Sequence, residues 1–117
     1  MTTPQFTMRK TANGWQAKSC IDLPDNGEIE EGSKRELHIT TSKSLSGYLV
    51  TYASACTVSD GFVRTRVFRD FHKLVYEAGD RCTERNVQAQ QLLVLKLVPE
   101  LLETAIAHEA AKQASEG

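Results

Sequence analysis

The stretch from residue 48 to residue 71 constrains the fold more than any other, because it has the pattern of a long β-hairpin. Asp60-Gly61 at its midpoint favours the two-residue type I′ turn that joins twisted antiparallel strands. Pairing about this turn gives one mostly apolar face and one small, polar and basic face. We expect the apolar face to pack in the core with Val50, Cys56, Val58, Val63, Val67 and Phe71. A sheet of this kind requires a layer that covers its apolar face.

A second hairpin is predicted near the N-terminus, with arms at 5–12 and 15–23. The dipeptide between them, Asn13-Gly14, is a strong short-range signal for a tight hairpin turn. Pairing about it sets Arg9 directly opposite Lys18 on the outer face. Like charges in this position repel each other mildly unless solvent or an anion lies between them.

A third strand is predicted over residues 34–43, because Leu37 and Ile39 alternate with polar side chains. Short connections join all of these segments, and short connections favour antiparallel neighbours. The N-terminal part of the chain therefore predicts an antiparallel β-meander of about five strands that contains two hairpins.

The residues after position 83 have the apolar spacing of a helix. Thr83 is a favourable N-cap, and Glu84 suits the positive end of the helix dipole. Pro99 removes one backbone hydrogen bond, so it should kink the helix or split it in two. We expect a long C-terminal helix, kinked at Pro99, that covers one face of the sheet.

Together these elements predict an α+β fold in a single domain of residues 1–117, frayed at 1–4 and 113–117. The expected core joins strand residues to one side of the helix. Its members are Trp15, Ile21, Leu37, Ile39, Val50, Val63, Val67, Phe71, Val94, Leu95, Val98 and Leu102.

A second apolar stripe on the C-terminal helix, rotated away from the first, carries Leu93, Leu97 and Leu101. A helix that is apolar on several sides is normally buried on all of them. We therefore expect a homodimer in which these leucines pack across the symmetry axis. The alternative is that residues 72–82 or the loop 25–33 cover them within one subunit.

The composition indicates an ordinary globular protein, with a net charge of −1 and 25% charged residues. No apolar stretch resembles a signal sequence or a membrane span, so we expect a cytoplasmic protein with no membrane contact. The cysteines are Cys20, Cys56 and Cys82. Their odd number and spacing predict free thiols rather than disulfides or a zinc site.

No catalytic, metal or cofactor motif is recognisable, and we expect a protein that is not an enzyme and has no cofactor. His72 could act as a general base oriented by Asp70, but the predicted pairing places the candidate nucleophiles Ser54 and Cys56 on the opposite face. His38, His72 and His108 are scattered along the sequence, which argues against a metal site.

The polar face of the central hairpin is the predicted binding site. Arg64 and Arg66 lie side by side there, between Phe62 and Phe68 and opposite small residues such as Ala55. Backbone phosphates and stacked bases suit such a surface. Arg9 and Lys18 extend this positive face if the first hairpin joins the same sheet. The favoured ligand is a single-stranded nucleic acid.

The order of elements, a meander followed by a kinked C-terminal helix, resembles the Whirly-type and positive-cofactor-type single-stranded-DNA binders. The resemblance covers topology only. It implies that the sheet binds the single-stranded DNA while the helices form the dimer. The alternative is a protein-interaction module, such as an inhibitor or adaptor carried by a mobile element. Such a module would use a sheet edge or the acidic loop 25–31.

Overall fold

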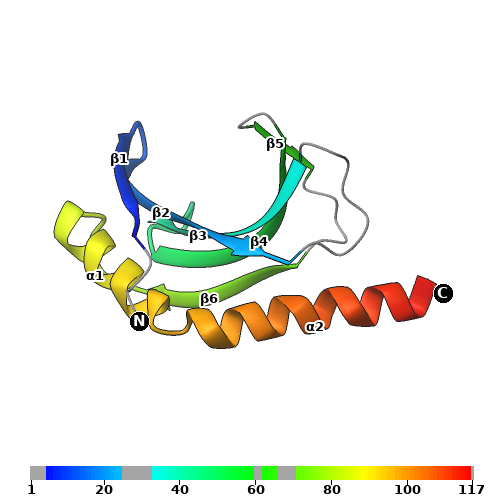
Figure 1. The fold of residues 1–117 in the computed structure, drawn as a ribbon. Coiled ribbons are helices and arrows are strands. Elements are labelled where there is room, and N and C mark those ends of the chain that lie inside the picture. Colours follow the sequence, from blue (N-terminus) through cyan, green and yellow to red (C-terminus); the bar gives the residue numbers. More distant parts are fainter. Residues whose placement is uncertain (1–4, 25–32, 60–61, 66–70, 117) are drawn as a thin grey trace.

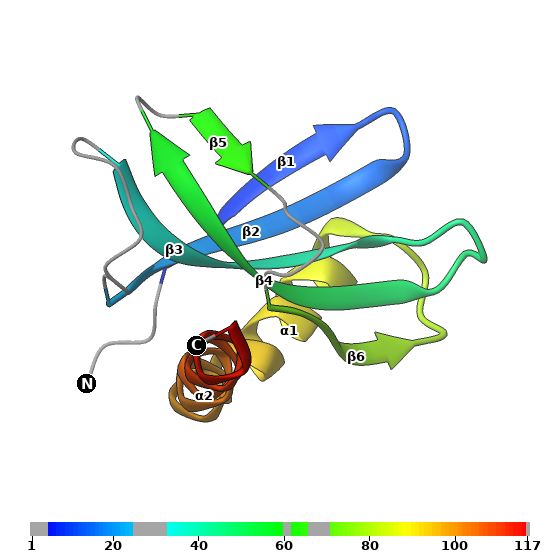
Figure 2. The same ribbon diagram turned by 90° about the vertical axis from the view of Figure 1, so that its right-hand side faces the viewer.

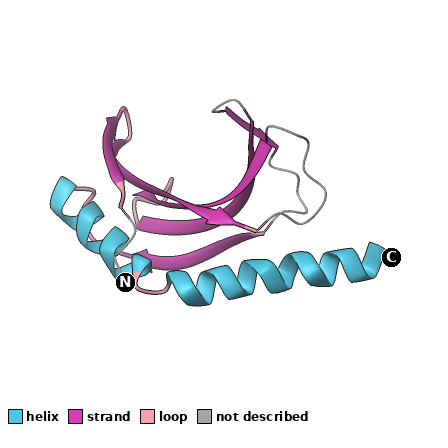
Figure 3. Ribbon diagram, in the orientation of Figure 1, coloured by secondary structure: helices cyan, strands magenta, loops and turns pink. Residues whose placement is uncertain are grey.

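The computed structural model describes residues 5–24, 33–59, 62–65 and 71–116, which form one antiparallel sheet and two helices (Figures 1 and 3). The α+β class and the antiparallel sheet are therefore confirmed, with six strands in the described residues where about five were expected. The elements are β1 (Thr7–Thr11), β2 (Gly14–Leu23), β3 (Ser33–Lys43), β4 (Leu49–Ser59), β5 (Phe62–Thr65), β6 (His72–Ala78), α1 (Glu84–Leu95) and α2 (Val98–Glu116).

The strand order is β1-β2-β3-β4-β5, and β6 pairs with β4 beside β5. Along β4, residues 49–54 pair with β6 and residues 57–59 pair with β5. The sheet is strongly curved, and both helices lie on its convex side (Figures 1 and 2). We call the side turned toward α1 and α2 the helix face, and the concave side turned away from them the open face.

The core lies between the helix face and the two helices. Leu37 and Ile39 of β3 are completely buried there, in the same cluster as Val94, Val98 and Leu101 of the helices. Phe6, Ile21, Val75 and Leu102 pack around this cluster and are partly buried. A smaller cluster beside it joins Ala17, Leu49 and Val87, with Trp15 packed against them.

The structure reverses the predicted orientation of β4. Ala53 and Ala55, expected on the polar outer face, are buried in the core under the helices. The cause is the register with β3, which sets Ile39 opposite Ala53 and Leu37 opposite Ala55. Cross-strand partners share a face, so the leucine and isoleucine take the alanines with them. Val50 is also buried, but alternation along β4 places it on the open face.

The first hairpin forms, but its turn lies at Ala12-Asn13, one position before the predicted one. Arg9 consequently pairs with Gln16 and not with Lys18. Gly14 has a φ of +116°, a conformation that glycine adopts readily, and it stands directly after the turn. The register shift of two residues keeps every side chain on its predicted face.

The central hairpin is shorter than predicted. Val58 pairs with Val63 as expected, but the register then shifts so that Thr65 lies opposite Thr57 and not opposite Cys56. The predicted pairing of Val50 with Phe71 does not occur. Phe71 instead accepts a hydrogen bond from the backbone N–H of Ala55 and packs in the core. The predicted strand ends at Phe71, and the sequence leaves residues 72–79 open between a strand end and a helix. The structure has β5 over Phe62–Thr65 and a further strand, β6, over His72–Ala78.

The C-terminal segment contains two helices separated by a turn at Lys96-Leu97. Thr83 is the N-cap of α1, as predicted, and its hydroxyl accepts a hydrogen bond from the backbone N–H of Asn86. Pro99 lies in the first turn of α2, where a missing N–H leaves no helical hydrogen bond unmade. In the described part of the chain, no helix combines the length and the apolar character that crossing a membrane requires.

Candidate functional site

The registers of four strands align polar side chains in a row across the open face. Cys20 pairs with His38, His38 with Ser54, and Ser54 with His72. Cross-strand partners point to the same side of a sheet, so these side chains share the open face. The neighbouring row contains Lys18, Thr40, Tyr52 and Leu74.

An aromatic pair lies near the middle of these rows. The rings of Tyr52 and His72 stack at a centroid distance of 4.9 Å with an interplanar angle of 15°. The hydroxyl of Ser54 is hydrogen-bonded to Nδ1 of His72, which fixes the orientation of the imidazole. Both rings are exposed to solvent, Tyr52 to 36%. The open face thus presents a flat aromatic surface, in which the hydrogen bond between Ser54 and His72 fixes the imidazole ring.

A buried ionic cluster lies beside the pair. His38 and Glu36 are 6% and 9% exposed, and His38 Nε2 lies 3.1 Å from Glu36 Oε1. The other carboxylate oxygen, Oε2, lies 3.3 Å from Nζ of Lys34. Burial alone would raise the pKa of Glu36, but the hydrogen bonds from His38 and Lys34 outweigh it and the pKa is lowered. Glu36 is therefore held as a carboxylate.

Cys20 stands directly opposite His38 and completes the cluster. Burial, followed by the negative charge of Glu36, raises the pKa of the Cys20 thiol, although Lys18 and Lys34 oppose this rise. The three cysteines are free, as the sequence predicted, but only Cys56 is fully buried. Cys20 is exposed, so its sulfur is accessible from the open face.

The predicted binding residues have different outcomes. Arg9 and Lys18 both lie on the open face, as the extension of the site required. Phe62 and Arg64 belong to β5, but their side chains, like Arg66 and Phe68, are outside the described residues. The small residues expected opposite the arginines, Ala53 and Ala55, are buried under the helices. The predicted trough of small residues therefore does not form on the open face.

Two associations in the structure were not predicted from the sequence. Ser54 and His72, expected on opposite faces, are joined by a hydrogen bond. A serine hydrogen-bonded to a histidine is part of the arrangement that activates a serine nucleophile. That arrangement also needs a group that orients the histidine and hydrogen-bond donors that stabilise the oxyanion. His38, expected to be isolated, contacts Glu36. The alternation of Glu36 and His38 on one strand face was a signal that could have been used.

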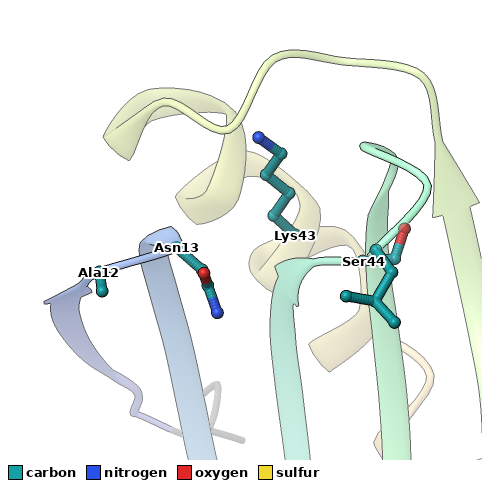
Figure 4. Close-up of a pocket in the computed structure, with 5 residues that line it drawn as sticks. Ala12, Asn13, Lys43 and Ser44 are labelled. Carbon is teal, nitrogen blue, oxygen red and sulfur yellow. The ribbon is translucent and has the colours of Figure 1, made fainter.

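A shallow pocket lies away from this face, at the tips of the β1–β2 and β3–β4 connections (Figure 4). Its lining residues are Ala12, Asn13, Lys43, Ser44 and Leu45, and its volume is about 290 Å³. That volume is at the lower limit for small-molecule sites, and the lining offers one charged group. We therefore place the candidate site on the open face.

Comparisons with models of known protein families, with curated proteins and with solved structures find no match to this chain. The function must consequently be argued from the residues of the open face and from the surfaces beside it.

Proposed function

We propose that the protein is a small, non-enzymatic binding protein whose open sheet face binds single-stranded nucleic acid. The observation that carries this proposal is the exposed stack of Tyr52 on His72. Sheet platforms that bind single strands stack bases on aromatic side chains and contact phosphates with basic ones. Arg9 and Lys18 supply the basic groups on this face.

The charges of the face predict a ligand held more by stacking than by phosphate contacts. Lys34 is a further basic side chain on this face, and it is engaged by the carboxylate of Glu36. Among the residues whose side chains the structure describes, Arg9 and Lys18 remain available for two phosphate contacts. Two contacts to a single strand correspond to a slope of log K against log salt of roughly −1.4. Binding should therefore depend only mildly on salt.

Replacing Tyr52 by alanine should weaken binding to a single-stranded oligonucleotide by about 1–3 kcal/mol, because a stacking surface is lost. Fluorescence anisotropy with a labelled oligothymidine at low salt measures this change. Tyr76→Ala is the matched control, since Tyr76 is 42% exposed but pairs with Thr51 on the helix-face side. Equal losses in the two variants, or a wild type that does not bind at all, would contradict the proposal.

The second candidate is a protein-interaction module, and β6 is the feature that favours it. This strand pairs only with β4 among the described strands, and it exposes Leu74 and Tyr76 to 43% and 42%. An edge of this kind can accept an extended segment of a partner by strand addition. The acidic loop 25–31, the other predicted contact, is outside the described residues.

The proposal includes a homodimer and a reducing, cytoplasmic location. Leu93 and Leu97 are 45% and 38% exposed, as an interface requires. Leu101, the third predicted interface residue, is only 5% exposed and packs in the core of its own subunit. The proposed interface therefore uses Leu93 and Leu97 with their exposed neighbour Leu92. Free cysteines suit a compartment that keeps thiols reduced.

A double variant, Leu93→Glu with Leu97→Glu, should be monomeric at concentrations where the wild type is dimeric, because two buried carboxylates per subunit would oppose association. Sedimentation equilibrium over a range of concentrations measures the dissociation constant. Leu45→Glu serves as the control, because Leu45 is fully exposed in the β3–β4 connection. A wild type that sediments as a monomer at high micromolar concentration ends the dimer proposal.

A further inference from the structure

Three side chains that commonly bind metals converge on the open face between β2 and β3. Ligand atoms of Cys20, Glu36 and His38 all lie within 4.8 Å of one another. Glu36 and His38 are two residues apart on β3 and share a side, and Cys20 stands opposite His38 on β2. A thiol, a carboxylate and an imidazole are therefore gathered by the register of two strands.

The distances are close to those of a coordination shell. Zinc binds histidine nitrogen and carboxylate oxygen at about 2.0–2.2 Å, so two such ligands in a tetrahedron lie about 3.3 Å apart. The observed separation of His38 Nε2 and Glu36 Oε1 is 3.1 Å. The sulfur of Cys20 lies within 4.8 Å of the other two ligand atoms, against about 3.6 Å in a zinc tetrahedron. It has to approach by at most about 1.2 Å, and an exposed side chain can do so by rotation.

The surroundings hold two of the ligands in place. Leu37, between Glu36 and His38, is completely buried and fixes the strand from the opposite side. Lys34 contacts Oε2 of Glu36 and leaves Oε1 directed at His38. Outer contacts of this kind orient metal ligands in proteins. The positive charge of Lys34 would oppose a cation, but its side chain is 63% exposed and can turn into solvent.

We propose that Cys20, Glu36 and His38 bind a divalent transition-metal ion of the zinc type, with the fourth coordination position open to solvent. The ligand set selects this class, because magnesium and calcium prefer oxygen ligands alone, whereas thiolate and imidazole favour zinc and its neighbours. Binding displaces the thiol proton of Cys20 into solvent, and His38 ligates through Nε2 as a neutral imidazole that carries its proton on Nδ1. The proposal does not rest on nucleic-acid binding, and the sequence had predicted no metal.

Cobalt(II) added to chelator-treated protein tests the site directly, because thiolate ligation gives an intense charge-transfer absorption. The wild type should saturate at one cobalt per chain and lose the band when zinc is added. Cys20→Ser should abolish the band and weaken zinc binding at least about 10-fold in a dye-competition titration. Cys82→Ser is the matched control, because Cys82 donates a hydrogen bond to the Trp15 carbonyl and lies outside the cluster.

The second variant is His38→Gln, with circular dichroism to establish that it folds. It should weaken zinc binding as much as Cys20→Ser, and zinc should raise the melting temperature of the wild type only. If His38→Gln does not fold, Cys20→Ser still tests the metal site. Cys20 is exposed, so its replacement by serine removes the thiolate ligand without disturbing the core. A wild type without the band, or a band that persists in Cys20→Ser, overturns the proposal.

Discussion

Replacing Leu37 by alanine is expected to lower the free energy of unfolding by about 2–5 kcal/mol. The side chain is completely buried in the cluster between β3 and the helices, so the shorter residue leaves a cavity. Its cross-strand partners are Ile21 and Ala55, and Ala55 is too small to fill the space. Small domains are stable by only about 5–15 kcal/mol, so this loss is a large fraction of the total.

Urea unfolding followed by far-ultraviolet circular dichroism measures the effect. Leu45→Ala makes the same chemical change at a fully exposed position and should alter stability by less than about 0.5 kcal/mol. If the two variants unfold at the same urea concentration, the helix face is not the core and the observed orientation of β3 is wrong.

The features that depend on neighbouring residues could be predicted from the sequence. The first hairpin, the pairing of Val58 with Val63 and the N-cap at Thr83 all follow from short-range signals. The open-face positions of Arg9 and Lys18 also follow, because a register shift of two residues does not change the face. Short-range signals therefore sufficed for the first hairpin, for the end of the central hairpin and for the start of the helical region.

The orientation of β4 could not be predicted, because both of its faces carry a mixture of apolar and small polar residues. The valines at 50 and 58 suggested the core, yet Ala53 and Ala55 occupy it. The deciding factor is β3, whose Leu37 and Ile39 have an unambiguous preference for burial and fix their partners by register. A strand with weak alternation takes its orientation from a neighbour with strong alternation.

The cluster on the open face depends on contacts that are distant in sequence. Cys20 meets His38 only through the register of β2 with β3, and a two-residue turn at Asn26-Gly27, the turn signal between these strands, would have set a different register. The curvature of the sheet adds to this effect, because side chains on a concave face are drawn together (Figure 1). The placement of Glu36 and His38 on one face of a strand could be predicted from the sequence, but their neighbour Cys20 on β2 could not.

Gln91 is expected to be the most sensitive polar residue of the core. It is completely buried on α1, and its Nε2 donates hydrogen bonds to the Ser19 hydroxyl and the Ile39 carbonyl. Its Oε1 accepts a hydrogen bond from Thr41 at 2.7 Å. One side chain thus connects the helix with both β2 and β3. Buried polar groups left without partners cost about 1–3 kcal/mol each.

Gln91→Leu should therefore destabilise the protein by about 2 kcal/mol or more, although leucine is apolar and similar in size, because the Ser19 hydroxyl and the Ile39 carbonyl lose their hydrogen bonds to Gln91. The Thr41 hydroxyl keeps its hydrogen bond with Thr51. Gln88→Leu is the control, since Gln88 lies one turn earlier on α1 and is only half-buried. Adding Ser19→Ala to Gln91→Leu removes the Ser19 hydroxyl, which is one of the buried groups that lose their hydrogen bond to Gln91. The double variant should accordingly be more stable than the sum of the two single changes predicts, by about 0.5–3 kcal/mol in a double-mutant cycle. Strictly additive effects would mean that the Gln91–Ser19 hydrogen bond does not contribute to docking α1 on the sheet.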